Sequence, residues 1–344
     1  MRIVWAAVCL LATVTPGLAA DVTLNETGST LLYPLFQRWV PVYAAARPGV
    51  KIVIAATGSG EGIQAAVEGK VQIGASDAYM SDEQAERNRQ IISVPLAIAA
   101  QTVNCNIPGV RALRLDGPAL AGIYSGQIRQ WDDAPIATLN PGVTLPHHAI
   151  VPVRREEASG DTFVFTQFLD FSTQRWEDRV GYGTTIAWPA VEGAVTATGN
   201  EGMVKAIAAT PFSVGYVGIS FSADAGEAGL VTVQLKNQSG QFVMPTAQTI
   251  SAAASVLDPR TPADERLSLV DAPGDESYPL VNYEYAVVST QQPNADTAAA
   301  IRAFLLWAIA ADGGNAPRYL DAVGFVPLPD FIRALSEKQI GRVR

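Results

Sequence analysis

The chain has 344 residues, with 24 lysines and arginines against 33 aspartates and glutamates, which gives a formal net charge of −9. This balance argues against a nucleic-acid or anionic-membrane partner, because both carry the same sign of charge as the protein. Hydrophobic residues make up 48% of the chain and charged residues 17%, which is typical of a well-packed globular protein and not of a disordered one. A chain of this length usually forms two domains.

The first twenty residues have the features of a secretory signal peptide. Arg2 precedes an apolar run over residues 3–14, and small residues lead to a cleavage point after Ala20. We therefore expect residues 1–20 to be removed on export and the mature protein to be periplasmic. Membrane attachment through Cys9 is an open alternative.

The mature chain offers little reactive chemistry. Cys105 would be its single cysteine, so we expect no disulfide and a buried thiol. His147 and His148 are adjacent in a loop, where they are expected at the surface and not in a metal site. The sequence contains neither a nucleophile elbow nor a phosphate loop. We expect no catalytic residue, metal or cofactor, and no later segment has the roughly 18 uninterrupted apolar residues of a membrane span.

The first part of the mature chain predicts a β-α-β-α-β unit. Strands are expected at 22–24, 51–55 and 71–74, and helices at 32–46 and 63–68, where apolar residues recur at helical spacing. Hydroxyl-rich turns follow each strand. In open α/β sheets ligands bind at these strand ends, so this unit predicts part of a binding site.

Two long extended stretches, at 90–106 and 278–288, exceed the length of an ordinary strand and are expected to cross between domains. This pattern predicts a hinged protein whose first domain is built from both ends of the chain. Between and after the crossings we expect helices at 118–124, 135–139, 163–171, 202–209, 247–257, 294–311, 317–322 and 329–339, and strands at 150–153, 213–217 and 230–235.

The stretch RREEASGDTFVF, at residues 154–165, joins a strand to a helix and can form half of an anion clamp. Free N–H groups at a helix start and the helix dipole attract anions. Ser159 adds a hydroxyl, and the planar guanidinium of Arg155 can bind two oxygens at once. The alternative is an ordinary helix capped by Ser159, with Arg155 paired to Glu157 on the surface.

Several segments, in the same order along the chain, resemble the phosphate-binding proteins of periplasmic ABC importers (PstS-type): GSTLLYPLFQRW, ATGSGEGI, IGASDA, GIYSGQIRQWDD, VRREEASGDTFVF and YPLVNYEYAVV. The resemblance implies a two-lobed α/β periplasmic-binding-protein fold (type II-like) with a two-strand hinge. Its first domain would comprise residues 21–97 plus 278–344, and its second residues 98–277.

The family function implied for this chain is high-affinity binding of inorganic phosphate in the periplasm and delivery to the permease and ATPase subunits of an ABC importer. A monomer without enzymatic activity is expected. Two alternatives stay open: another oxyanion such as sulfate or molybdate, and an exported phosphate scavenger or adhesin that meets no transporter.

Matching the family's motifs residue by residue implies a set of phosphate ligands. Many members have an aromatic residue where Leu31 stands, which matters little if only the Leu31 N–H binds. Many have threonine where Asp161 stands. The Asp161 carboxylate is therefore expected to orient Arg155 in place of a hydroxyl ligand. Glu61 would place a further negative charge near the anion. The implied ligands are Thr30, the Leu31 amide, Ser59, Asp77, Arg155, Ser159, and the Gly160 and Asp161 amides.

Asp77 suggests which anion is bound. A carboxylate repels a fully ionised anion but can accept a hydrogen bond from one that carries a proton. Near neutral pH phosphate keeps a proton and sulfate does not. A site built around such a hydrogen bond can reject the analogue lacking it by about 10⁴. Asp77 therefore favours phosphate, whereas its alternative role is that of a turn residue.

Overall fold

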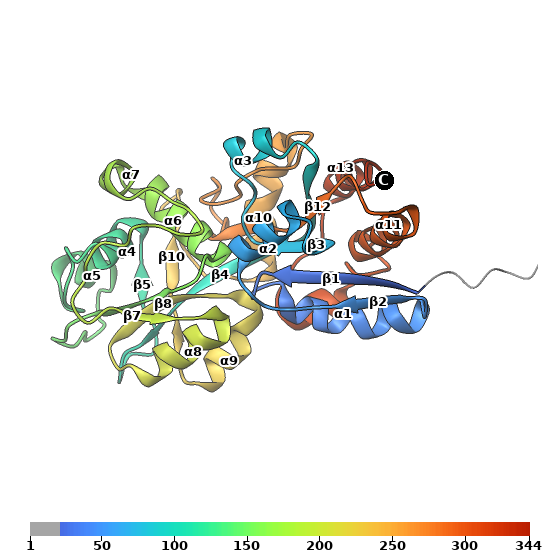
Figure 1. Cartoon of the computed structure of the whole chain (residues 1–344). Coiled ribbons are helices and arrows are strands. Elements are labelled where there is room, and N and C mark those ends of the chain that lie inside the picture. The colour runs from blue at the N-terminus through green and yellow to red at the C-terminus, as the bar shows by residue number, and fades with distance from the viewer. Residues whose placement is uncertain (1–20) are drawn as a thin grey trace, which may run out of the picture.

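The computed structural model describes residues 21–344 (Figure 1). The expected signal peptide and Cys9 lie outside the described residues. The described strands are β1 (Val22–Gly28), β2 (Val50–Val53), β3 (Ile73–Ser76), β4 (Ile91–Asn106), β5 (Arg114–Leu115), β6 (Val151–Arg155), β7 (Val195–Ala197), β8 (Ser213–Gly218), β9 (Val231–Thr232), β10 (Gln234–Lys236), β11 (Phe242–Val243) and β12 (Val281–Ser289).

Helices of very different lengths connect these strands. They are α1 (Tyr33–Ala46), α2 (Ser59–Val67), α3 (Asp82–Arg87), α4 (Gly117–Tyr124), α5 (Ala134–Leu139), α6 (Gly160–Ser172), α7 (Gln174–Arg179), α8 (Gly199–Ala209), α9 (Ser222–Glu227), α10 (Ala247–Leu257), α11 (Ala295–Ile309), α12 (Pro317–Leu320) and α13 (Asp330–Ile340).

The long strand β4 joins two groups of strands into one sheet of order β2-β1-β3-β12-β4-β8-β6-β7. Its first part, up to Ala100, pairs with β12, and its second part, from Gln101, pairs with β8. We call β2-β1-β3-β12 and their helices the first lobe, and β8-β6-β7 and their helices the second lobe. The predicted crossing at 90–106 is confirmed. The return strand begins at Val281, three residues later than expected, and the domain limits given above stay a prediction.

In the first lobe, α1 connects β1 to β2 and α2 connects β2 to β3, and the three strands are parallel. Trp39 of α1 is fully buried and meets Phe304 of α11 edge to face, which ties the two ends of the chain together. The second helix begins at Ser59, four residues earlier than expected. Gly58 before it has φ = 99°, a conformation that favours glycine, and this turn sets Ser59 at the helix start.

In the second lobe, β6 lies between parallel neighbours β7 and β8, and α6 begins five residues after β6 ends. Phe165 of α6 stacks on Tyr216 of β8 with ring centroids 4.4 Å apart, so the helix is fixed against the sheet. The expected strand 230–235 is interrupted, because β9 pairs with β4 whereas β10 joins a separate small sheet with β5 and β11.

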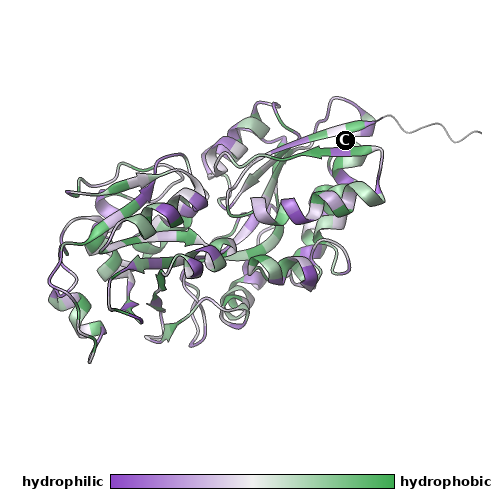
Figure 2. Ribbon diagram, turned by 90° about the horizontal axis from the view of Figure 1, so that it is seen from below, coloured by the Kyte–Doolittle hydropathy of each residue, from purple (hydrophilic) through white to green (hydrophobic). Residues whose placement is uncertain are grey.

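Green hydrophobic and purple hydrophilic residues alternate along the helices, and hydrophobic stretches mark the central strands (Figure 2). Cys105 is fully buried, as expected, and so are Trp39, Trp131 and Trp176. His147 is exposed and hydrogen-bonds Asp132, which agrees with the expected surface position. Among residues 21–344, no helix has both the length and the apolarity that a membrane span requires.

Glu26, in the middle of β1, is a buried acid outside the candidate site. Its side chain is 3% exposed, and within the described residues no donor makes a well-formed hydrogen bond to either carboxyl oxygen. Burial raises the pKa of Glu26 to about 8, against a small opposing contribution from the Ala55 backbone. The folded protein therefore holds this proton more tightly than the unfolded chain does.

Glu26→Gln is expected to stabilise the protein at neutral pH. Below pH 4.5 the carboxyl is protonated in both states, but as the pH rises toward 8 only the unfolded state gains by releasing the proton, so wild-type stability falls. The variant lacks this loss, worth on the order of 3 kcal/mol at pH 7. Urea unfolding should show that the free energies of unfolding of the two proteins diverge between pH 5 and 7.5. A difference that does not change with pH would contradict the account.

Candidate functional site

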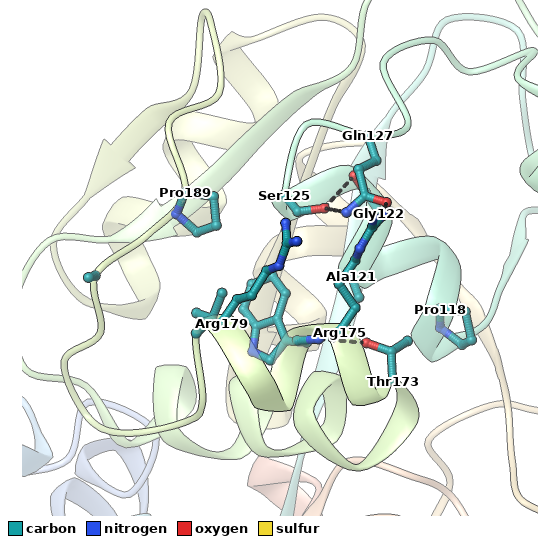
Figure 3. Close-up of a pocket in the computed structure, with 12 residues that line it drawn as sticks. Pro118, Ala121, Gly122, Ser125, Gln127, Thr173, Arg175, Arg179 and Pro189 are labelled. Carbon is teal, nitrogen blue, oxygen red and sulfur yellow. Dashed lines mark hydrogen bonds between the residues drawn. The ribbon is translucent and has the colours of Figure 1, made fainter.

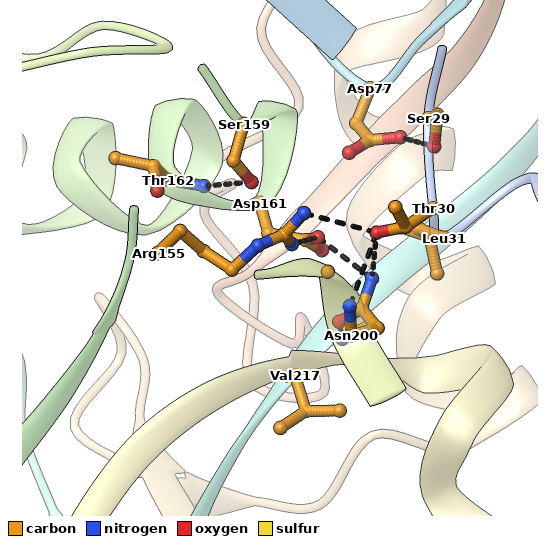
Figure 4. Close-up of polar contacts among 12 residues, drawn as sticks. Ser29, Thr30, Leu31, Asp77, Arg155, Ser159, Asp161, Thr162, Asn200 and Val217 are labelled. Carbon is orange, nitrogen blue, oxygen red and sulfur yellow. Dashed lines mark hydrogen bonds and ion pairs between the residues drawn. The ribbon is translucent and has the colours of Figure 1, made fainter. Parts of the chain in front are cut away.

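The candidate site lies where the strand ends of the first lobe face the start of α6 in the second lobe (Figure 4). The Ser59 hydroxyl accepts the Asp77 N–H at 3.2 Å. A methyl group placed on Gly160 would lie 2.5 Å from Asp77 Oδ2 and would also overlap Ser59, so the two lobes meet closely here. All the predicted ligand residues are buried around this point: Thr30, Leu31, Ser59, Asp77, Arg155, Ser159, Gly160 and Asp161.

Arg155 ends β6 and reaches across toward the first lobe. Its Nη1 donates to Asp161 Oδ2 at 2.5 Å, and its Nη2 donates to Thr30 Oγ1 at 3.1 Å. The guanidinium also pairs with Glu157. The side chain is 1% exposed, so the alternative of a surface ion pair is wrong: the pair exists, but it is buried. Burial lowers the pKa of Arg155, but Asp161 and Glu157 outweigh this and hold it above its usual value.

Backbone N–H groups converge on the same place. Ser159 caps α6 and accepts the Thr162 N–H at 3.3 Å. Within residues 21–344, no acceptor is found for the N–H groups of Leu31, Ser59, Gly160 and Asp161. Buried N–H groups are rarely left without an acceptor. The arrangement therefore provides a cluster of free backbone donors, which is the kind of environment that suits an anion.

Asp77 and Asp161 make this donor-rich site unusual, because both carboxyl groups are buried within it. Ser29 donates its hydroxyl to Asp77 Oδ1, while Asp77 Oδ2 has no donor within the described part of the chain. Burial raises the pKa of Asp77, and hydrogen bonding with Glu284 and Ser29, together with the charge of Arg155, partly opposes this. Burial and Asp77 raise the pKa of Asp161 to about 7. An anion that brings its own proton satisfies these oxygens, whereas a fully ionised anion does not.

Asn200, at the start of α8, belongs to the site but was not predicted. Its Nδ2 donates to Thr30 Oγ1 at 2.9 Å and to Asp161 Oδ2 at 2.8 Å, and its Oδ1 accepts the Gly218 N–H at 2.6 Å. It therefore links the two lobes next to the anion cluster. The available signal was the Thr-Gly-Asn sequence of residues 198–200, where Gly199 has φ = 68° and starts the helix three residues before the expected position.

A groove of about 930 Å³ between the lobes lies outside this cluster, with walls from both lobes that include Glu61, Tyr79 and Tyr182. Gly60 N–H donates to the Ala158 carbonyl at 3.0 Å, which joins α2 to the turn before α6. Glu61 is exposed in this groove, where water screens its charge. Its expected effect on a buried anion is correspondingly small.

A separate cavity of about 490 Å³ lies in the second lobe (Figure 3). Trp176, Arg175 and Arg179 line it, and Arg175 hydrogen-bonds Gln127 across its edge. No predicted ligand residue lines this cavity. It is therefore distinct from the candidate site.

Gly160→Ala is expected to weaken anion binding by about 10- to 100-fold, because the new methyl group would occupy space held by Ser59 and Asp77 and keep the lobes apart. Gly202→Ala is the matched control, since a methyl group there meets its nearest atom at 3.8 Å. The two variants should be compared by phosphate titration and by thermal unfolding. Equal affinities would show that close approach at Gly160 is not required.

The chain matches the model of the PBP superfamily domain over residues 13–312. It is 32% identical to the phosphate-binding protein PstS of Methanocaldococcus jannaschii, covering 94% of this chain and 87% of that protein. It is 31% identical to PstS of Pasteurella multocida, covering 90% and 87%.

Solved structures show the same fold. A high-affinity periplasmic phosphate-binding protein solved with phosphate bound superposes with a TM-score of 0.72 at 24% identity, covering 91% of this chain and 92% of that one. Three observations point to the same family: two lobes joined by β4, the order of the sequence segments quoted above, and the sequence identity to its members. The chain therefore belongs to the PBP superfamily and, within it, to the family of the PstS phosphate-binding proteins.

Proposed function

We propose that this protein binds inorganic phosphate between its two lobes and delivers it to an ABC importer. The observation that carries the proposal is a buried carboxyl oxygen, Asp77 Oδ2, that no N–H or hydroxyl group of residues 21–344 reaches and that lies beside the start of α6. Free N–H groups and Arg155 would hold the phosphate oxygens, and the Asp77 carboxylate would accept a hydrogen bond from the phosphate hydroxyl group. The names of the relatives, which are phosphate-binding proteins, support the same ligand.

The eight residues expected as ligands are proposed to act as two sets. From the first lobe, Thr30 and Ser59 supply hydroxyl groups and Leu31 supplies its amide. Asp77 accepts a hydrogen bond from the phosphate hydroxyl group. From the second lobe, Arg155 and Ser159 contribute side chains, and Gly160 and Asp161 contribute amides. Because the sets come from different lobes, phosphate would hold the lobes together and present the closed form to a transporter.

Sulfate and molybdate are the competing ligands, and the acid content of the site argues against both. Neither carries a proton near neutral pH, so each would place its oxygens against the Asp77 carboxylate without a hydrogen to share. The net negative charge of the chain does not oppose phosphate binding, because local donors, not the overall field, contact the ligand.

The cellular setting is proposed on the same grounds. The leader-like residues 1–20 support export to the periplasm, and the PstS relatives support a phosphate-binding role. We propose a monomer without enzymatic activity that works with permease and ATPase subunits. The test is to add the phosphate-loaded protein to vesicles containing the importer of its own organism. Stimulated ATP hydrolysis is expected, and binding of phosphate without any stimulation would favour a scavenger or adhesin.

Phosphate binding itself can be tested by equilibrium dialysis. The protein, stripped of ligand by reversible unfolding, is dialysed against radiolabelled phosphate with sulfate or molybdate as competitor. One phosphate per chain that neither competitor displaces is the expected result. Displacement by either competitor at equal concentration would overturn the proposed selectivity.

A further inference from the structure

A second fully buried carboxyl group, that of Glu284, lies beside Asp77 on the neighbouring strand β12. Strand β12 pairs with β3 so that Tyr285 lies opposite Ser76. Continuing this antiparallel register by one residue places Glu284 opposite Asp77. Glu284 is 0% exposed, and the register of β12 against β4 shifts between Glu284 and Tyr285. The site is therefore in contact with the strand that, with β4, occupies the middle of the sheet.

The hydrogen bonds around the two acids leave one oxygen of each without a donor. Asn282 Nδ2 donates to Glu284 Oε1 at 2.8 Å and to the Asp77 carbonyl at 3.3 Å. Within the part of the chain that the structure describes, no N–H or hydroxyl group reaches Glu284 Oε2 or Asp77 Oδ2. The Glu284 and Asp77 carboxyl groups are within hydrogen-bonding range of each other. Such a contact is stable only if one of the two carries a proton.

The neighbouring charges do not supply an alternative to that proton. Glu284 faces the acids Asp77 and Asp161, and the cation that acts on Asp77, Arg155, already pairs with Glu157 and Asp161. Burial, followed by the charge of Asp77, raises the pKa of Glu284 well above its usual value. Asp77 has the Ser29 hydroxyl and the field of Arg155, whereas Glu284 has an amide donor alone. The proton therefore belongs on Glu284.

We propose that Glu284 stays protonated and donates a hydrogen bond to Asp77, so that it is the positioning residue that keeps Asp77 ionised and aimed at the ligand. This inference rests on the proposed binding of phosphate. With one shared proton, the pair carries a single negative charge and presents one acceptor to the phosphate hydrogen. Without it, two adjacent negative charges would repel any anion.

Glu284→Gln tests the proton directly, because a glutamine amide can donate to Asp77 while its oxygen accepts from Asn282. The variant is expected to bind phosphate within about threefold of the wild type at pH 7. As the pH is raised toward 10, the wild type should lose affinity as Glu284 ionises, and the variant should lose less. Glu284→Leu, which has no donor, should lose affinity by about tenfold or more.

Infrared difference spectroscopy detects the proton on Glu284 itself, which would be absent if Glu284 were ionised and only contributed to packing. The wild type should show the carbonyl band of a protonated carboxylic acid that is absent from Glu284→Gln. Absence of that band, or phosphate binding at least tenfold tighter in Glu284→Gln than in the wild type, would show that Glu284 is ionised and would overturn the inference. If Glu284→Gln fails to fold by circular dichroism, the wild-type spectrum is compared with that of Glu284→Leu instead. Glu26 and Glu265 also hold protons near neutral pH, so only a difference between wild type and a Glu284 variant isolates the Glu284 band.

The outcome is separable from that of the proposed function. If the wild type binds no phosphate, the proposed function fails, but the carboxylic acid band still reports whether Glu284 holds a proton beside Asp77. If phosphate binds and the band is absent, the proposed function stands and the role of Glu284 falls.

Discussion

Asp77→Asn is expected to lower the ratio of phosphate to sulfate affinity by about 10⁴. Asparagine replaces an acceptor with an amide that can donate from the same position. Phosphate then loses the partner of its proton, and sulfate gains a donor where it met a negative charge. The dissociation constants of both anions, measured at neutral pH on wild type and variant, give the ratio.

The matched control is Glu61→Gln, which removes one negative charge from the exposed groove beside the site. Screening by water should leave the affinity ratio nearly unchanged. If both variants gained sulfate binding equally, the overall charge of the cleft would set selectivity, and Asp77 would not be its acceptor. If Asp77→Asn still excluded sulfate, a group other than Asp77 would determine the selectivity for phosphate over sulfate.

Arg155→Met is expected to reduce the free energy of unfolding by about 3–5 kcal/mol in the absence of phosphate. Removing the guanidinium leaves the buried Asp161 and the partly buried Glu157 without their cation, and Thr30 loses a donor. Phosphate affinity should fall by about 1000-fold, equivalent to about 4 kcal/mol. Urea unfolding and phosphate titration measure the two effects independently.

The neighbouring arginine provides the control for this change. Arg154 lies with its guanidinium 5.5 Å from the centre of the Trp188 ring and donates to the Pro189 carbonyl at 3.0 Å. Arg154→Met should cost about 1 kcal/mol and leave phosphate affinity unchanged. Equal losses of stability in the two variants would contradict the special role of the buried network, and unchanged phosphate binding in Arg155→Met would remove Arg155 from the ligands.

Much of the fold could be predicted because long elements carry strong local patterns. The helix at 32–46 and the extended stretch at 90–106 were placed to within a residue of α1 and β4. Helices α3, α7 and α9 were missed, because six residues are too few to show helical periodicity and none of the three opens with a proline, as the short helices α5 and α12 do. The break between β9 and β10 was missed because it depends on which distant strand each part pairs with.

The site could be predicted where its residues directly follow a strand or open a helix. The turn containing Ser59 and the loop from Arg155 to Asp161 have this local signature, and the structure brings them together. Asn200 also follows a strand and opens a helix, but the expected helix began three residues too late to include it. Glu284, inside a strand, has no such signature. Asn200 contacts Thr30, 170 positions away, and Glu284 meets Asp77 only through the pairing of β12 with β3, so both contacts follow from the topology of the sheet.

The central claim is that a buried acid among anion-binding donors selects a protonated oxyanion. Calorimetric titration of the mature protein, stripped of bound ligand, with phosphate and separately with sulfate at neutral pH tests it most directly. We expect tight binding of one phosphate per chain and no heat of binding with sulfate. Absence of phosphate binding, or an equal response to sulfate, would contradict the account.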